Sequence, residues 1–307
     1  MKKVISLAFI LGVFILSLKF HNEIVNIIIN TINNFDHTIN ESTKLANNEY
    51  AINQDYKFIK ITDNFSPKSD TDIKNIYYTI INSGMNNFTF YCNNEYKNCI
   101  DDINYISNNQ KLLSYINDFV PAYNSFKNIE TEFDSLGKIK VTIKHNYTQA
   151  EIDEINNKID EIIKSEINDD MDDEAKIKAI HDYIINNTKY DKDRSDNKVT
   201  KYNSNTAYGA LIEGYAICGG YADSMKLFLD KFKIPNFKVS SENHIWNAVY
   251  LNNKWYHLDL TWDDPVTKND EDILEYNYFL IDTDELLSLE QEQHIFDQNI
   301  FLEFKEN

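Results

Sequence analysis

One cysteine in the C-terminal half of the chain lies at the start of a predicted helix, a position that can make a thiol nucleophilic. From Cys218 onward, Tyr221, Met225 and Leu229 recur on one helical face, which predicts a buried helix beginning at the cysteine. The dipole and free N–H groups of a helix N-terminus favour a thiolate and can stabilise an oxyanion. A cysteine at a helix start is more often structural, so this pattern needs partners elsewhere in the chain.

A histidine and an aspartate in two predicted strands supply such partners. Asparagine tolerates positive φ, so Asn252-Asn253 predicts a two-residue hairpin turn with Leu251 opposite Lys254. In this register His244 and Asp259 are diagonal neighbours on one sheet face, within side-chain reach. A slip of one residue would turn the aspartate to the other face. The same register places Ala248 opposite His257, Trp246 opposite Asp259 and His244 opposite Thr261.

The combination of a cysteine at a helix start with a histidine and an aspartate on one sheet face predicts nucleophilic acyl transfer. A carboxylate that accepts one imidazole N–H fixes the tautomer, and the other ring nitrogen can then meet a thiol. His257 shares the predicted face and is an alternative base. His181 is expected to be structural, with a supporting role as the alternative, and His294 shows no partner pattern. The histidines and cysteines lack zinc-finger spacing, so we expect neither a metal nor another cofactor.

The elements expected around these residues follow from apolar spacing. Residues 138–145 alternate as a strand, and helices are predicted from about Gln149 to Ile167 and from about Asp173 to Asn187, the second with Asp172 as N-cap. Residues 20–65 are expected to form a polar, loosely packed lead-in, and residues 188–206 an irregular segment. A hairpin is possible around Cys92 and Cys99.

Three ordered motifs resemble the transglutaminase-like superfamily, and within it the bacterial transglutaminase/protease-like proteins. They are C-G-G-Y-A (218–222), H-I-W-N (244–247) and H-L-D-L-T-W-D-D-P (257–265), supported by I-H-D-Y-I (180–184), Y-D (190–191) and A-Y-G-A-L (207–211). The resemblance covers about residues 138–282 and departs at Ile245, where alanine is more common. It implies an α+β fold with a papain-like core, in which a central helix bearing the cysteine packs on an antiparallel sheet.

The resemblance also implies roles for individual residues. Cys218 matches the nucleophile, His244 the base and Asp259 the orienting carboxylate, which favours His244 over His257. Side chains that could line a substrate cleft or contribute to an oxyanion site, with core packing as the alternative, are Tyr208, Tyr215, Trp246 and Trp262.

The N-terminus and the cysteines both indicate export. Lys2 and Lys3 precede an uncharged run from Val4 to Leu18, the layout of a secretory signal that is either cleaved or retained as an anchor. An apolar first helix of a cytosolic domain is the alternative. An oxidising compartment permits a disulfide between Cys92 and Cys99, although three reduced cysteines remain an alternative.

Composition limits the function classes further. The 307-residue chain has a formal net charge of −19, which disfavours nucleic acid binding. We expect a protein or peptide substrate, for which the cell surface is a candidate location, with membrane contact only through the N-terminal segment. The expected organisation is a signal or anchor (1–23), a mixed, mainly helical N-terminal region (24–135) and a catalytic domain (136–307). A non-enzymatic binding or scaffold module is the alternative function.

Overall fold

The computed structural model of the chain describes residues 20–21, 23, 25–27, 29–30, 45–266 and 273–306. Most of the predicted signal or anchor segment therefore lies outside the described residues. Within those ranges, no helix combines the length and apolar character that a membrane crossing requires.

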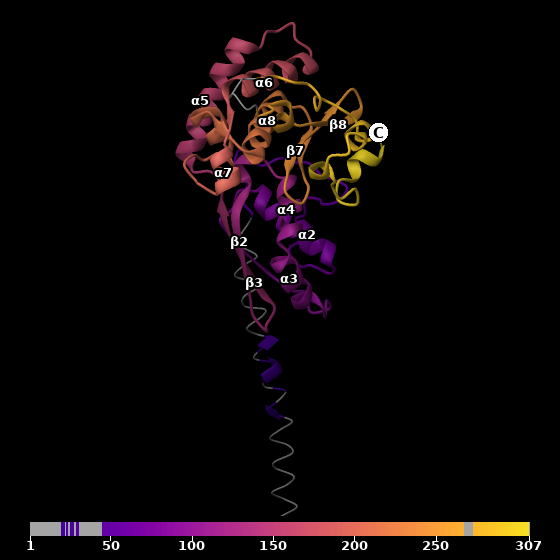
Figure 1. Cartoon of the computed structure of the whole chain (residues 1–307). Coiled ribbons are helices and arrows are strands. Elements are labelled where there is room, and N and C mark those ends of the chain that lie inside the picture. The colour runs from indigo at the N-terminus through magenta and orange to yellow at the C-terminus, as the bar shows by residue number, and fades with distance from the viewer. Residues whose placement is uncertain are drawn as a thin grey trace, which may run out of the picture.

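Within residues 45–145, three α-helices and one short 3-10 helix accompany a three-stranded antiparallel sheet (Figure 1). The sheet has the strand order β1-β3-β2. β1 therefore pairs with β3, and not with a strand formed by the residues that directly follow β1. The predicted hairpin around the first two cysteines is therefore wrong: Cys92 follows β1, and Cys99 is the first residue of α3. The elements are α2 (Asp70–Asn82), β1 (Asn87–Tyr91), α3 (Cys99–Asn108), α4 (Gln110–Asp118), η1 (Ala122–Asn124), β2 (Phe126–Phe133) and β3 (Lys138–His145).

The C-terminal half places helices beside a second antiparallel sheet of order β6-β7-β8. The long helix α8 contacts β6 and β7, and α6 lies on the other side of α8 (Figure 1). Its main elements are α5 (Gln149–Glu166), α6 (Asp173–Asn187), α8 (Cys218–Phe232), β6 (Asn236–Ser240), β7 (Ile245–Leu251) and β8 (Lys254–Leu258). The mixture of helices and sheets agrees with the predicted α+β class.

Short elements connect these parts. Residues 188–206 are not uniformly irregular, because they contain β4, which pairs in parallel with β5, and the helix α7. The short elements are β4 (Lys189–Tyr190), α7 (Lys192–Asn197), η2 (Gly209–Glu213), β5 (Tyr215–Ala216), α9 (Leu260–Asp263), α10 (Thr283–Ser288), η3 (Glu292–His294) and η4 (Leu302–Glu306).

The boundaries predicted for α5 and α6 are confirmed. Capping residues close to the helix starts explain why the sequence could predict them. Thr148 and Glu151 form a capping box at the start of α5. The side chain of Asp172 accepts a hydrogen bond from the backbone N–H of Ala175 (2.9 Å), as an N-cap residue does.

The β7–β8 hairpin has the predicted register. Asn252 and Asn253 both have positive φ (51° and 64°), and Leu251 pairs with Lys254. Alternate residues along β7 enter different cores: Trp246 and Ala248 join one hydrophobic cluster, and Val249 joins the other. Both faces of this sheet are therefore covered.

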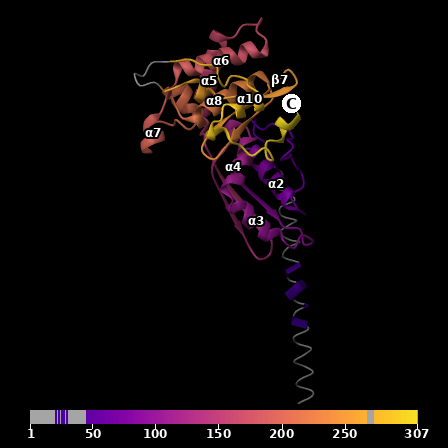
Figure 2. The same cartoon turned by 45° about the vertical axis from the view of Figure 1, so that its right-hand side comes forward.

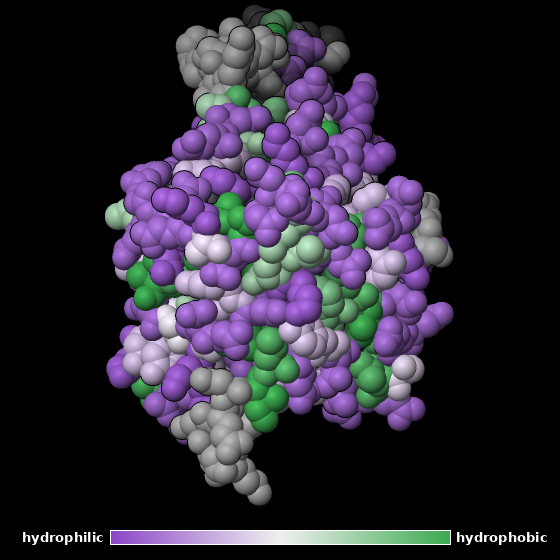
Figure 3. Space-filling view, turned by 90° about the horizontal axis from the view of Figure 1, so that it is seen from above, coloured by the Kyte–Doolittle hydropathy of each residue, from purple (hydrophilic) through white to green (hydrophobic). Residues whose placement is uncertain are grey.

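The first hydrophobic cluster joins segments that are far apart in the sequence. The Phe119 ring lies 5.1 Å from that of Phe237, which lies 6.0 Å from that of Phe301. Tyr56 and Ile59 are also buried in this cluster, so residues 45–65 are more tightly packed than predicted. The C-terminal segment contacts β8, and Figures 1 and 2 both place it beside the β7–β8 hairpin. The face seen from above is mainly hydrophilic, with small scattered apolar patches (Figure 3).

Candidate active site

Cys218 is the first residue of α8 and carries a free, half-buried thiol. Two glycines let a loop pack against this helix start. A Cβ at Gly219 would lie 2.3 Å from the Oδ1 atom of Asn205, and one at Gly220 would lie 2.4 Å from the carbonyl oxygen of Ser204. The glycines therefore fix the position of the cysteine by close backbone packing.

The structure brings His244 and Asp259 together, but not as the residues of paired strands. β8 ends at Leu258, so the predicted cross-strand pairs of Trp246 with Asp259 and of His244 with Thr261 do not form. Asp259 is instead the N-cap of α9, and its Oδ1 atom accepts from the backbone N–H of Thr261 (2.9 Å). Its Oδ2 atom accepts from the Nε2 atom of His244 at 2.5 Å.

Electrostatics favour a charged imidazole next to this carboxylate. Burial disfavours the imidazolium of His244, but the charge and hydrogen bond of Asp259, with a further contribution from Cys218, raise its pKa to about 10. Burial would also raise the pKa of Asp259, yet His244 and the hydrogen bond from His294 hold that pKa well below its usual range. With Nε2 bound to the carboxylate, Nδ1 is the ring nitrogen that can meet the thiol.

His294 belongs to the same cluster, although the sequence showed no partner for it. Its Nε2 atom lies 2.9 Å from Asp259 Oδ2, so one carboxylate oxygen accepts from two imidazoles. The ring stacks on Tyr278 at 4.8 Å, and its Nδ1 atom has no hydrogen-bond partner among the described residues. An ionised carboxylate is only an acceptor, so His294 carries its proton on Nε2. No local pattern links residues 35 positions apart, so tertiary packing alone reveals this contact.

The two imidazoles and the carboxylate could also be considered as metal ligands, because one ligand atom from each lies within 4.8 Å of the others. Zinc ligands lie about 2.0–2.2 Å from the ion and direct lone pairs at it. Here both Nε2 atoms point directly at Oδ2, at 2.5 and 2.9 Å, as N–H donors do. We therefore assign the cluster to hydrogen bonding.

His257, the alternative base, is held as a neutral core residue. Its Nδ1 atom accepts the indole N–H of Trp246 at 3.0 Å, and its Nε2 atom lies 3.1 Å from the Thr283 hydroxyl. Burial lowers its pKa to about 3. Since the lone pair of His257 is already used, its ring is not available to accept a proton from the cysteine. The ring of Trp246 also stacks on that of His244 at 5.6 Å.

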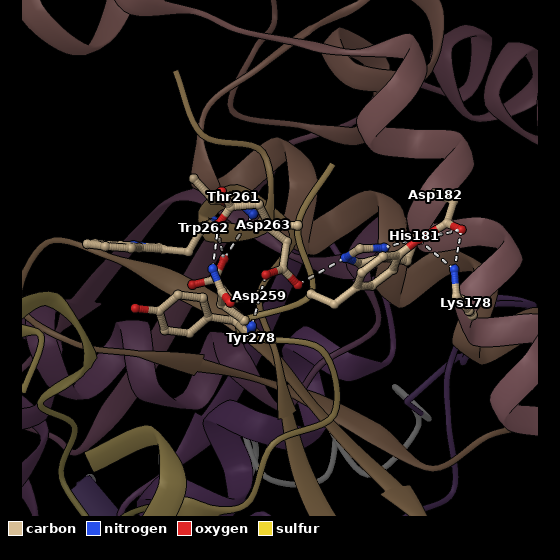
Figure 4. A network of polar contacts seen from close by, with 11 residues as sticks. Lys178, His181, Asp182, Asp259, Thr261, Trp262, Asp263 and Tyr278 are labelled. Atoms are coloured by element: carbon tan, nitrogen blue, oxygen red, sulfur yellow. Dashed lines mark hydrogen bonds and ion pairs between the residues drawn. The ribbon is translucent and has the colours of Figure 1, made fainter. Parts of the chain in front are cut away.

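A second polar chain supports the α9 turn from the side of α6 (Figure 4). The Nε2 atom of His181 lies 3.1 Å from Asp263 Oδ2, and its Nδ1 atom lies 3.0 Å from Asp182 Oδ1. The other oxygen of Asp263 accepts from the backbone N–H of Tyr278 (2.9 Å). Figure 4 shows this chain ending beside Asp259, so His181 fixes the turn that holds the carboxylate.

The four predicted cleft residues lie in different places. Tyr208 donates its hydroxyl to Glu154 (2.9 Å), and Tyr215 stacks on Tyr202 at 4.0 Å. Trp246 is buried in the core, and Trp262 is half-buried against Tyr278 and His294.

A cavity of about 350 Å³ opens at Cys218, and its wall comes mainly from the α7 region that the sequence analysis treated as irregular. None of the four predicted cleft residues lines it. The lining residues are Tyr190, Arg194, Ser195, Lys198, Thr200, Ile217, Cys218 and Asn243.

Comparison with known proteins agrees with the resemblance seen in the sequence. Residues 161–260 match the model of the transglutaminase-like superfamily, which confirms that resemblance for this segment. A solved structure described as "Crystal structure of a TGase" is similar at 16% identity and a TM-score of 0.34, and the match covers 47% of each chain, so it spans about half of that protein. No curated protein sequence matches the chain significantly. The matched segment contains Cys218, His244 and Asp259.

Proposed function

We propose that the protein is a thiol-dependent acyltransferase or peptidase that acts on protein or peptide amides. Cys218 is the nucleophile, His244 the acid and base, and Asp259 the orienting carboxylate, within a papain-like core formed by α8 and the β6–β8 sheet. The observation that supports this most is the imidazole of His244: one ring nitrogen binds Asp259, and Cys218 is close enough to contribute to the raised pKa of the ring.

The reaction follows from these positions. The thiolate attacks the amide carbon, and the new C–S bond produces an oxyanion that N–H groups at the start of α8 can stabilise. As the C–N bond breaks, the imidazolium of His244 gives its proton to the departing amine. A thioester remains. Water or an amine then attacks it, His244 takes the proton, and the thiolate is released. Water gives deamidation or proteolysis, and an amine gives a cross-link.

His294 is proposed as a positioning residue in this reaction. Its hydrogen bond to Asp259 Oδ2 stabilises the ionised carboxylate and limits its rotation. A fixed, charged Asp259 keeps the ring of His244 oriented toward the thiol.

The location and organisation are part of the proposal. The N-terminal segment would export the chain or anchor it in the membrane, residues 136–307 would carry the catalytic site, and residues 24–135 would support it. The Cys92–Cys99 disulfide (S–S 2.02 Å) is compatible with an oxidising compartment.

A thiol-directed acylating probe tests the assignment. The purified protein should be labelled at one site, and Cys218→Ala should abolish the labelling. Labelling of His244→Ala should fall strongly, because the imidazolium no longer supports the thiolate. Equal labelling of wild type and Cys218→Ala would refute the assignment. A protein that stays unlabelled but binds a partner tightly would instead support a non-enzymatic module.

A further inference from the structure

We propose that the cavity beside Cys218 binds a carboxylate of the acyl substrate, with Arg194 as the residue that recognises it. The inference rests on the proposed function and names the substrate class: peptide amides close to an acidic side chain or to a free C-terminal carboxylate. Both sources present the same planar, two-oxygen anion.

The charge of the cavity wall is the first observation. Among the described residues, Arg194 and Lys198 are the charged side chains that line it. Both are cationic, in a chain with 49 acidic and 30 basic residues. A local cationic wall in such an acidic protein raises the concentration of anions next to the thiol.

The type of residue is the second observation. Arg194 is the single arginine among the 30 basic residues of the chain. Lysine supplies a point charge, whereas the planar guanidinium can donate two parallel N–H groups to one carboxylate. The composition of the chain therefore strongly favours lysine, and its single arginine lines a cavity that also contains the predicted nucleophile.

The guanidinium is held in place. Arg194 is half-buried, and its Nη1 atom donates to the backbone carbonyl of Tyr202 at 3.2 Å. This contact uses one of five guanidinium N–H groups. The backbone N–H of Arg194 is bound to Asp191 Oδ1 at 3.1 Å, which fixes the first turn of α7. Lys198 follows α7, and its Nζ atom donates to the carbonyl of Ser195 at 3.2 Å.

The nearby carboxylates do not occupy the cavity. Asp191 is buried and caps α7, while Asp193 and Asp196 are exposed on that helix. None of the three lines the cavity wall. The remaining lining side chains include hydroxyl and amide groups, on Tyr190, Ser195, Thr200 and Asn243, which can hydrogen-bond a carboxylate.

Alkylation by two nearly isosteric reagents tests the proposal without any substrate turnover. Iodoacetate and iodoacetamide each form a thioether with the thiolate and release iodide, but only iodoacetate carries a carboxylate. We expect the iodoacetate/iodoacetamide rate ratio at Cys218 to exceed that of a free thiol. Arg194→Gln/Lys198→Gln should lower the ratio about tenfold or more, because charge-assisted hydrogen bonds are lost.

Matched variants separate local recognition from general charge. Lys189→Gln/Lys192→Gln removes the same charge from residues outside the cavity wall and should leave the ratio nearly unchanged. Arg194→Lys keeps the charge and should give an intermediate ratio if the planar fork matters. A wild-type ratio no higher than that of a free thiol, or an equal fall in the Lys189/Lys192 control, would overturn the proposal.

Peptide amides then identify the source of the carboxylate. Four substrates suffice: a Glu or a Gln beside the target amide, each with a free or an amidated C-terminus. A higher kcat/KM with Glu indicates side-chain recognition, and one with the free C-terminus indicates terminal recognition. Turnover that is equal for all four overturns the inference but leaves the proposed function intact. Failure of Cys218 to react with either alkylating reagent refutes the proposed function itself.

Discussion

The Oδ2 atom of Asp259 accepts hydrogen bonds from both His244 and His294, at 2.5 and 2.9 Å. Two donors on one buried oxygen stabilise its negative charge, and this charge keeps His244 protonated. At neutral pH His244 is therefore expected to be an imidazolium.

Replacing Asp259 with Asn should separate orientation from charge. The Asp259→Asn variant loses the main cause that raises the pKa of His244 to about 10, so this pKa should fall. In wild type, the imidazolium that protonates the departing amine should persist, and kcat/KM should stay high, until the pH approaches 10; in the variant, this range should end several pH units lower. We expect kcat/KM to fall on the order of 10²–10⁴-fold. An unchanged pH profile of kcat/KM would contradict this role.

Substitution of His294 tests the positioning role by its effect on His244. His294→Phe keeps a ring but removes the donor to Asp259, while His294→Gln retains a possible donor. We expect His294→Phe to lower kcat roughly 10- to 100-fold with little change in KM, since the reacting groups lose alignment. His294→Gln should recover part of the loss. A purely structural role predicts equal defects in both variants and an unshifted pH profile.

At the scale of elements, the start of α8 and the loop before it hold the thiol in place. The backbone N–H of Ile217 donates to the carbonyl of Ser204 at 2.8 Å, and Gly220 lies directly against the same carbonyl. This is a backbone-to-backbone contact, which cannot relax by rotation of a side chain.

Gly220→Ala should therefore disturb the helix start. The added Cβ would lie 2.4 Å from the Ser204 carbonyl oxygen, so either the loop or α8 must move. We expect a loss of about 1–3 kcal/mol of unfolding free energy, measured by urea denaturation, and slower labelling of Cys218. Lys231→Ala, in the last turn of the same helix, is the control and should alter neither. Unchanged stability and labelling in Gly220→Ala would show that the loop accommodates the methyl group freely.

At the scale of the whole molecule, buried polar contacts join the two halves of the chain. The Ser240 hydroxyl at the end of β6 donates to Asp118 at the end of α4 (2.5 Å). Lys238 forms a buried ion pair with Asp223 of α8 (2.7 Å), whose other oxygen accepts from Tyr147 (2.6 Å). These contacts hold α8, the β6–β8 sheet and the N-terminal half in one arrangement.

Asp118 should make stability depend on pH. Burial raises its pKa from 3.8 to about 7, so between these values the folded protein holds a proton that the unfolded chain has released. Unfolding free energy should therefore fall as the pH rises from about 4 to about 7, by up to about 4 kcal/mol, and this contribution should level off above that range. Urea denaturation at several pH values gives the unfolding free energy as a function of pH. This free energy should change less with pH in Asp118→Asn than in wild type. The exposed Asp101→Asn variant is the control and should keep the pH dependence of wild type. The same pH dependence in Asp118→Asn and wild type would contradict the raised pKa of Asp118.

Local patterns in the sequence determined much of this protein. Capping residues and apolar spacing set α5, α6 and the start of α8 at Cys218, and Asn252-Asn253 set the register of the β7–β8 hairpin. These features depend on residues within a few positions of one another, where backbone sterics and short hydrogen bonds dominate.

Only the tertiary structure decided how the site is completed. Asp259 reaches His244 as a helix N-cap and not as a strand residue, His294 joins from the C-terminal segment, and Arg194 lines the cavity from α7. Each contact joins segments without a shared periodicity, so it arises when packing of the two hydrophobic clusters brings distant backbones together. The sequence could specify Cys218 and His244 as candidate site residues, while their surroundings depend on long-range packing that no local pattern encodes.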